Sequence, residues 1–133
     1  MKAKRHYRLP SGKELTIGGG TLVMGILNVT PDSFSDGGKW NTLDKALAHA
    51  MQMVEDGAAI IDVGAESSRP GFVPVSAAEE IERLAPFLEH IVSKIPVPIS
   101  IDTFKAETAR AALRLGADIL NDIWAVSYTH LTL

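Results

Sequence analysis

The chain contains no cysteine among its 133 residues. That absence excludes disulfide bonds, zinc sites built on thiolates and a cysteine nucleophile. The four histidines, His6, His49, His90 and His130, show no spacing typical of metal ligands, so we expect no histidine-based metal site. A cysteine-free composition suits a cytoplasmic protein, and we expect that location.

Long apolar runs and an excess of positive charge are also missing. No uninterrupted apolar stretch approaches the roughly 20 residues that span a bilayer, so we expect no membrane segment. The basic start, residues 1–6, is not followed by the apolar core of a signal peptide, so secretion is not expected. The formal net charge of −3 leaves no electrostatic footprint for nucleic acid, and we expect no such partner.

The pattern of apolar runs predicts an α/β fold. Two short strand patterns flank the turn Pro10-Ser11-Gly12-Lys13 and predict a hairpin near the N-terminus. Apolar strands and amphipathic helices then alternate, which is typical of parallel strands joined by right-handed helical crossovers. The strands are expected at residues 21–29, 59–64, 97–101 and 118–121, and the helices at about 43–55, 77–92 and 105–115.

Capping residues set the expected helix ends. Asn41 or Thr42 is expected to cap the first helix, and Thr103 the third, because their side-chain oxygens can accept an unpaired backbone N–H. Ser76 with Glu79 forms a capping box before the second helix. Pro86 lies inside that helix and is expected to kink it, since proline removes one backbone hydrogen bond.

Each of the four strands is expected to end in a carboxylate or carboxamide. The residues are Asn28, Asp62, Asp102 and Asn121, the last followed by Asp122. Carboxyl ends of parallel strands share one rim, where ligands bind, so these side chains are expected to converge. Alternatively, each is a helix cap or a turn residue, for which Asp and Asn are favoured.

Two polar loops adjoin the predicted rim. The first, Thr30 to Gly38, is rich in Ser, Asp and Gly and makes a poor core but a good ligand contact. The second, Glu66 to Gly71, carries Ser67, Ser68 and Arg69, which favour an anion site. Alternatively, Arg69 pairs with Glu66 in a Pro-Gly turn. Elsewhere, Lys105 and Arg110 are expected on a solvated helix face.

Three stretches together resemble bacterial dihydropteroate synthase, over about Leu22 to Trp124. They are Met24 to Gly38, Asp62 to Gly71, and Ser100 to Phe104 with Asn121-Asp122-Ile123. The second departs mildly from the family pattern, with Ala65 in place of a Gly and Ser68 in place of a Thr. The resemblance implies a (β/α)8 TIM barrel, divided here into a hairpin at 1–20, a partial pterin-binding barrel at 21–124 and a tail unlike the family at 125–133.

The family condenses 6-hydroxymethyl-7,8-dihydropterin diphosphate with 4-aminobenzoate to give 7,8-dihydropteroate and pyrophosphate. By resemblance, Asn28 would be a ligand of Mg²⁺ on the diphosphate, and the two loops would close over the aminobenzoate. Asp32, Ser68 and Arg69 would act in catalysis. The resemblance implies the following substrate-binding residues: Asn28, Asp62, Ser67, Ser68, Arg69, Asp102 and Asn121.

The resemblance also implies an incomplete barrel, because such barrels typically need about 250 residues. A Lys, an Arg and a His that complete the family's site have no counterpart here, and a truncated or mis-joined reading frame would explain this. We expect the polypeptide alone to be inactive or unstable, and a full-length form to be a homodimer. Two alternatives remain: a methyltetrahydrofolate-dependent corrinoid methyltransferase, and a non-catalytic half-barrel that only binds ligand or self-associates.

Overall fold

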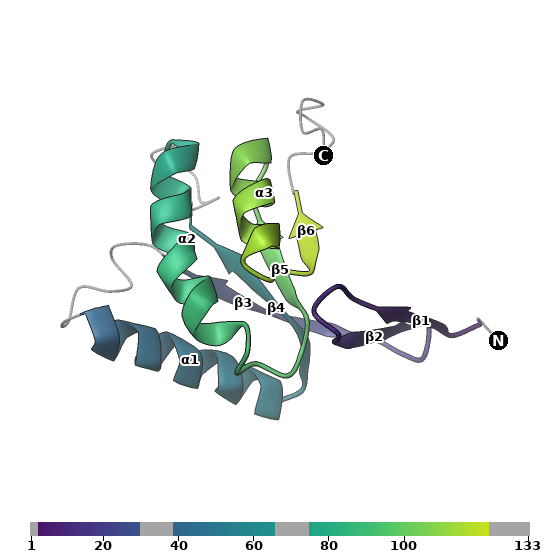
Figure 1. The fold of residues 1–133 in the computed structure, drawn as a ribbon. Helices are drawn as coiled ribbons and strands as arrows, with labels where there is room; N and C mark the ends of the chain where they lie inside the picture. The colour runs from purple at the N-terminus through teal and green to yellow at the C-terminus, as the bar shows by residue number, and fades with distance from the viewer. Residues whose placement is uncertain (1–2, 30–38, 66–74, 123–133) are drawn as a thin grey trace.

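The structure is a computed structural model that describes residues 3–29, 39–65 and 75–122 (Figure 1). Both polar loops and the tail at 125–133 therefore lie outside the described residues. The elements in chain order are β1 (Arg5–Arg8), β2 (Glu14–Ile17), β3 (Val23–Asn28), α1 (Lys39–Glu55), β4 (Ala58–Gly64), α2 (Ala77–Ile91), β5 (Ile99–Asp102), α3 (Ala106–Arg114) and β6 (Ile119–Asn121).

Two sheets form from these strands. β1 and β2 pair antiparallel as a hairpin, and β3, β4, β5 and β6 form a parallel sheet in that order. Every neighbouring pair in the parallel sheet is joined by one helix, which is the β-α-β repeat predicted from the apolar runs. The predicted α/β fold, with an N-terminal hairpin and four parallel strands, is confirmed.

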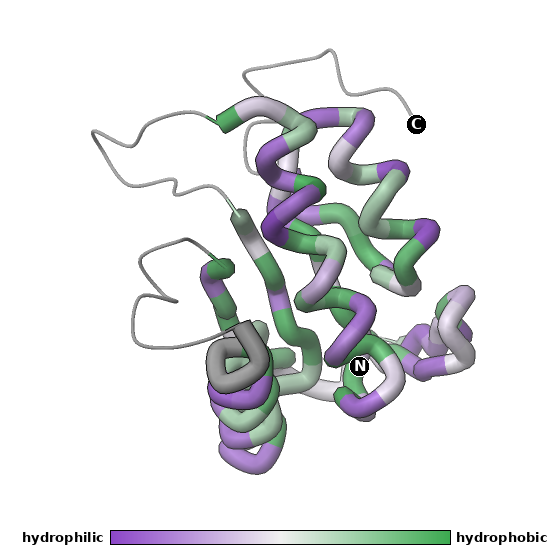
Figure 2. The backbone as a smooth tube through the Cα atoms, turned by 60° about the vertical axis from the view of Figure 1, so that its left-hand side comes forward, coloured by the Kyte–Doolittle hydropathy of each residue, from purple (hydrophilic) through white to green (hydrophobic). Residues whose placement is uncertain are grey.

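One face of the parallel sheet is buried under the helices. Alternate strand residues such as Leu27, Val63 and Ile101 belong to one core cluster with Phe87 and Leu88 of α2. Burying each large apolar side chain stabilises the fold by about 1.5–3 kcal/mol. Figure 2 shows the matching pattern, with the strands of the parallel sheet largely apolar and the helices carrying both polar and apolar residues around their turns.

The opposite face of the sheet carries the other alternate residues. On β3, Met24 and Ile26 lie on this face, and Ile26 is 63% exposed. On β4, β5 and β6 the same face carries Asp62, Ser100 and Ile119, which continue the register row that begins at Ile26. This face is called the open face below, and the candidate site lies on it.

The helix ends agree with the sequence in part. Ser76 Oγ accepts the Glu79 N–H at 3.2 Å, so the predicted cap of α2 is confirmed. The predicted caps of the other two helices are wrong. α1 already begins at Lys39, which leaves Asn41 and Thr42 inside the helix. The N-cap of α3 is Lys105. The Thr103 hydroxyl instead accepts the Lys105 N–H at 3.1 Å, in the turn before the helix.

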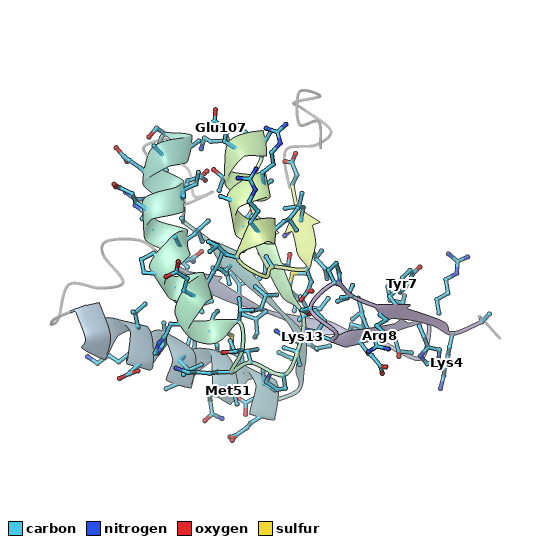
Figure 3. All side chains as sticks on the ribbon, viewed as in Figure 1. Lys4, Tyr7, Arg8, Lys13, Met51 and Glu107 are labelled. Carbon is cyan, nitrogen blue, oxygen red and sulfur yellow. The ribbon has the colours of Figure 1, made fainter. Side chains whose placement is uncertain are left out.

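The hairpin docks at the amino ends of the parallel strands. The Ser11 N–H donates to Asp118 Oδ1 at 3.2 Å, and Lys13 Nζ donates to the Val92 carbonyl at 3.1 Å (Figure 3). Asp118 Oδ2 also accepts the Ile99 N–H at 3.4 Å, so one carboxylate joins the hairpin turn to the start of β5. The hairpin therefore lies at the end of the sheet opposite the strand carboxyl ends.

None of the helices in the described part of the chain is both long and apolar enough to cross a membrane.

Candidate functional site

The carboxyl ends of the four parallel strands bring their last residues into one row. Asn28 pairs in register with Gly64, Gly64 with Asp102, and Asp102 with Asn121. Asn28 is exposed, while Asp102 and Asn121 are half-buried. The structure thus places three of the four predicted strand-end residues side by side on the open face. We call this set, Asn28, Gly64, Asp102 and Asn121, the rim row.

Asp62 is not a strand end, and that part of the prediction is wrong. β4 continues for two further residues, because Val63 and Gly64 pair with both neighbouring strands. Asp62 therefore lies one layer below the rim row, beside Ser100 on β5, and is only 3% exposed. Its side chain points to the same open face as the rim row, since residues two apart on a strand share a face.

A hydrogen bond joins the two layers. Asn121 Nδ2 on β6 donates to Asp62 Oδ2 on β4 at 3.3 Å, although β5 lies between these strands. Neighbouring strands lie about 4.8 Å apart, so β4 and β6 backbones are separated by roughly twice that spacing. Side chains can meet across this gap only where they converge, which indicates that the open face is concave here. The bond also orients the amide, leaving Asn121 Oδ1 to accept from a ligand.

Two buried polar atoms lie at the base of this concavity. Asp62 Oδ1 and Ser100 Oγ are inaccessible to solvent and have no hydrogen-bond partner among residues 3–29, 39–65 and 75–122. Buried polar atoms without a partner are costly and rare in folded proteins. A ligand that donates an N–H to Asp62 Oδ1 would satisfy one of them.

Burial controls the charge of Asp62. Removal from solvent raises the pKa of the Asp62 carboxyl above its ordinary value of 3.8, and the nearby Ser100 hydroxyl and Asn121 amide oppose that rise. Ser100 lies beside Asp62 in register, so its hydroxyl acts by proximity without a well-directed hydrogen bond. The carboxyl is therefore protonated more readily than an exposed aspartate.

Gly64 leaves a gap in the middle of the rim row. A Cβ at this position would lie 3.5 Å from Asp102 Cβ, 3.6 Å from Asp102 Oδ2 and 3.9 Å from Asn28 Oδ1. The glycine thus leaves space between the amide of Asn28 and the carboxylate of Asp102. Sequence reasoning missed Gly64 and Ser100 as site residues. Their positions two residues beyond Asp62 and two before Asp102 were the available signal, because such residues share a face.

The remaining predicted site residues cannot be placed. Asp32, Ser67, Ser68 and Arg69 lie outside the described residues. The described chain reaches the start of the second loop at Ala65.

Ala65, the residue after β4, is held by helix α2. Arg83 donates an N–H from its guanidinium to the Ala65 carbonyl at 2.8 Å, which ties the end of β4 to the helix.

The oxygen donors of the rim suit a hard cation. Within the described part of the chain, no group of three or more His, Cys, Asp or Glu side chains is arranged to hold a metal ion. Mg²⁺ does not need such a group, since it keeps several waters and often takes one or two protein oxygens together with phosphate. Asn28, exposed at the rim, offers one such oxygen, so the residues present fit Mg²⁺ bound mainly through water and a ligand.

The prediction that Lys105 lies on a solvated helix face is wrong. Lys105 Nζ lies 3.4 Å from Glu80 Oε2, a buried carboxylate on α2, and 4.6 Å from the centre of the Phe104 ring. Arg110, the other residue of that prediction, is exposed. Glu80, the partner of Lys105, is distant in sequence, so no pattern around Lys105 predicts this contact.

Residues 24–132 match the family described as Pterin binding enzyme. A curated relative, dihydropteroate synthase of Bacillus subtilis, is 59% identical over 108 residues, which cover 81% of this chain and 38% of the relative. The chain therefore spans well under half the length of that relative.

Solved structures resemble the fold over a similar part of their length. Dihydropteroate synthase from Xanthomonas albilineans, with 4-aminobenzoic acid, superposes with a TM-score of 0.78 at 47% identity, covering 90% of this chain and 44% of that one. Dihydropteroate synthase from Clostridium difficile, in the presence of pteroic acid, gives a TM-score of 0.76 at 52% identity, covering 82% of this chain and 41% of that one. The sheet and helices described above thus correspond to part of the barrel of these proteins.

Proposed function

This chain belongs to the pterin-binding enzyme family, and from that premise we propose that it forms the pterin-binding part of a dihydropteroate synthase. The reaction would condense 6-hydroxymethyl-7,8-dihydropterin diphosphate with 4-aminobenzoate. The observation that carries the proposal is the hydrogen bond from Asn121, which lies beside Asp102 in the rim row, to Asp62 one layer below on the concave open face.

The polar atoms of this site complement the edge of a dihydropterin. That edge presents several N–H donors, which carboxylate and amide oxygens accept. The Asn121 amide is oriented by its bond to Asp62, so its oxygen is available to accept. Asp62 Oδ1, buried and without a partner in the described chain, would accept a further donor. Asp102 would hold the same ring from the rim row.

The diphosphate would lie toward Asn28, at the exposed end of the rim row. Asn28 would hold Mg²⁺, which when bound neutralises charge on the departing diphosphate. Because Gly64 has no side chain, a ligand would be able to lie between the side chains of Asn28 and Asp102. In this proposal the pterin would lie over Asp102 and Asn121, and its diphosphate would extend to the opposite end of the row.

In the proposed reaction the C–O bond between the pterin methylene and the diphosphate breaks, and the diphosphate leaves with the bonding electrons. The aniline nitrogen of 4-aminobenzoate forms a C–N bond to that methylene and then loses a proton. Asp32, Ser68 and Arg69 would act here, with Ser67, by contacting the second substrate and excluding water from the reacting carbon. No covalent enzyme nucleophile is required.

The relatives support the synthase over its rivals. The curated relative and both solved structures reported above are dihydropteroate synthases. A methyltetrahydrofolate-dependent methyltransferase would grip a pterin with similar residues but would have no use for the diphosphate position at Asn28. The open face of β3, with Ile26 63% exposed, is the observation that favours the half-barrel alternative, in which the chain only binds ligand or associates with itself.

We also propose that the full-length protein works as a cytoplasmic homodimer. The cysteine-free sequence supports a reducing compartment.

Titration calorimetry with 6-hydroxymethyl-7,8-dihydropterin diphosphate, with and without Mg²⁺, tests the proposal. We expect the chain to bind this ligand, and Mg²⁺ to strengthen that binding more than it strengthens binding of the same pterin without diphosphate. Asn28→Ala should remove the Mg²⁺ effect while leaving affinity for the diphosphate-free pterin near that of the wild type. Absence of binding under all conditions would contradict the proposal, and equal affinities with and without diphosphate would favour the methyltransferase.

A further inference from the structure

A buried carboxylate lies behind the candidate site, on the helix side of the sheet. Glu80 of α2 is 2% exposed. Its Oε2 accepts the Thr108 hydroxyl at 2.7 Å and the Thr103 hydroxyl at 3.3 Å, and it lies 3.4 Å from Lys105 Nζ. Three groups from the β5–α3 connection and from α3 therefore converge on one oxygen of a different helix.

These contacts reach the rim row through the backbone. Thr103 directly follows Asp102, and its N–H donates to the Asn121 carbonyl at 3.3 Å. The Thr103 hydroxyl also accepts the Lys105 N–H at 3.1 Å, which shapes the turn into α3. A single residue, Thr103, thus contacts Glu80 through its side chain and the two rim residues proposed to hold the pterin through its backbone.

Stability alone does not explain a charged group in this place. Moving a carboxylate and an ammonium out of water costs several kcal/mol per ion, and apolar replacements of buried pairs are often neutral or stabilising. An ion pair with oriented hydrogen bonds does fix geometry, because each partner accepts or donates only along certain directions.

We propose that Glu80 is a positioning residue, whose carboxylate holds the β5–α3 connection and thereby keeps Asp102 and Asn121 in the arrangement that binds the pterin. This inference rests on the proposed function for its ligand. The positioning itself is a property of the chain and can be measured without ligand.

The test compares Glu80→Gln with Glu82→Gln, which makes the same substitution at an exposed position of α2. Thr108→Val removes the shortest contact to Glu80 at nearly constant volume, and Thr108→Ser keeps the hydroxyl. Each variant of the 133-residue chain is measured by amide hydrogen exchange, by thermal unfolding, and by titration with 6-hydroxymethyl-7,8-dihydropterin diphosphate and Mg²⁺.

We expect exchange at the Thr103 N–H to accelerate about tenfold in Glu80→Gln and Thr108→Val, while exchange at Ile61 in the central strand stays unchanged. Glu82→Gln and Thr108→Ser should behave like the wild type. Affinity of the folded protein for the pterin should weaken about tenfold in Glu80→Gln, and this loss should be absent when Asp102→Asn is already present.

Other results would overturn the inference. A lower unfolding temperature in Glu80→Gln, with unchanged Thr103 exchange and unchanged pterin affinity, would mean that Glu80 is structural only. Uniform acceleration of exchange at Thr103 and Ile61 would mean the same. If the wild type binds no pterin, the proposed function fails, and the comparison of Thr103 with Ile61 exchange still decides the role of Glu80.

Discussion

Asn121 donates its side-chain N–H to Asp62 Oδ2 at 3.3 Å, across the strand that separates them in the sheet. The bond fixes which end of the Asn121 amide faces the open side. It also gives the buried Asp62 carboxylate a donor on one oxygen while the other oxygen has none in the described chain. The pair therefore orients one acceptor, Asn121 Oδ1, and leaves a second, the buried Asp62 Oδ1, without a donor in the described chain.

Exchanging the two side chains tests this pair. Asn121→Asp places two carboxylates against each other and removes the donor, so we expect pterin affinity to fall about tenfold or more. Asp62→Asn combined with Asn121→Asp restores one donor and one acceptor and should recover part of that affinity. Calorimetric titration with the pterin diphosphate gives both values.

The control for the exchange is Asp56→Asn, which removes an exposed carboxylate at the end of α1. It should leave pterin affinity unchanged. A double variant that binds as weakly as Asn121→Asp would show that the hydrogen bond does not orient the amide.

The pH dependence of stability follows from the raised pKa of Asp62. Between the unfolded pKa near 3.8 and the higher folded pKa, the folded chain binds more protons than the unfolded chain. The contribution of this group to stability is therefore fully present below the unfolded pKa and is lost as pH rises through the folded pKa. Because asparagine is never charged, the Asp62→Asn variant should not lose this stability as pH rises.

Urea unfolding at a series of pH values measures that difference. We expect the free energy of unfolding of Asp62→Asn, relative to wild type, to rise with pH from about 4 upward and to become constant above the folded pKa. Asp56→Asn again serves as the control. A pH-independent difference would show that burial does not raise the Asp62 pKa.

Filling the gap at Gly64 should affect binding more than folding. In Gly64→Ala the new methyl group meets Asp102 at ordinary contact distances of 3.5 and 3.6 Å, so the strand should accept it. We expect a change of less than about 1 kcal/mol in the free energy of unfolding. Affinity for the pterin diphosphate should fall about tenfold if the ligand crosses the rim row at this point.

Gly57→Ala is the matched control for that variant. Gly57 directly precedes β4, at the end of that strand opposite the rim row, and a methyl group added there would meet no other atom within 4 Å. It should leave pterin affinity unchanged. Equal affinities of Gly64→Ala and wild type would exclude a ligand between Asn28 and Asp102.

Local signals in the sequence were enough for the fold. Apolar runs such as Ala59 to Gly64 predict strands buried on both faces, and the capping box at Ser76 fixes the start of α2, because both depend on neighbouring residues only. The row of Asn28, Asp102 and Asn121 was also predictable, since parallel strands share a rim.

The rest of the site depends on register and on distant partners. Asp62 was named as the polar end of its strand although the predicted strand ran on to residue 64, and pairing with β3 and β5 confirms that β4 ends at Gly64. Glu80 and Lys105 come from different parts of the chain, and no sequence pattern near either residue predicts their contact. Such contacts arise only when the whole sheet and its helices are assembled.

The turn after α3 gives a last prediction, about stability. Gly116 has a φ of +107° and closes α3 in a Schellman motif, in which the Ala117 N–H donates to the Ala112 carbonyl and the Gly116 N–H to Leu113. In Gly116→Ala the new methyl group would also lie 2.6 Å from Val92 Cγ1. Gly57 has a similar φ of +110°, and a methyl group added there would have no other atom within 4 Å.

Both alanine variants carry about 1–2 kcal/mol of left-handed strain, and Gly116→Ala should lose about 1–3 kcal/mol more by overpacking against Val92. Urea unfolding of the two variants gives the difference directly, and Val92→Ala in the Gly116→Ala background should recover the overpacking part while leaving the strain. Equal losses in the two glycine variants would show that α3 shifts away from Val92 at no cost.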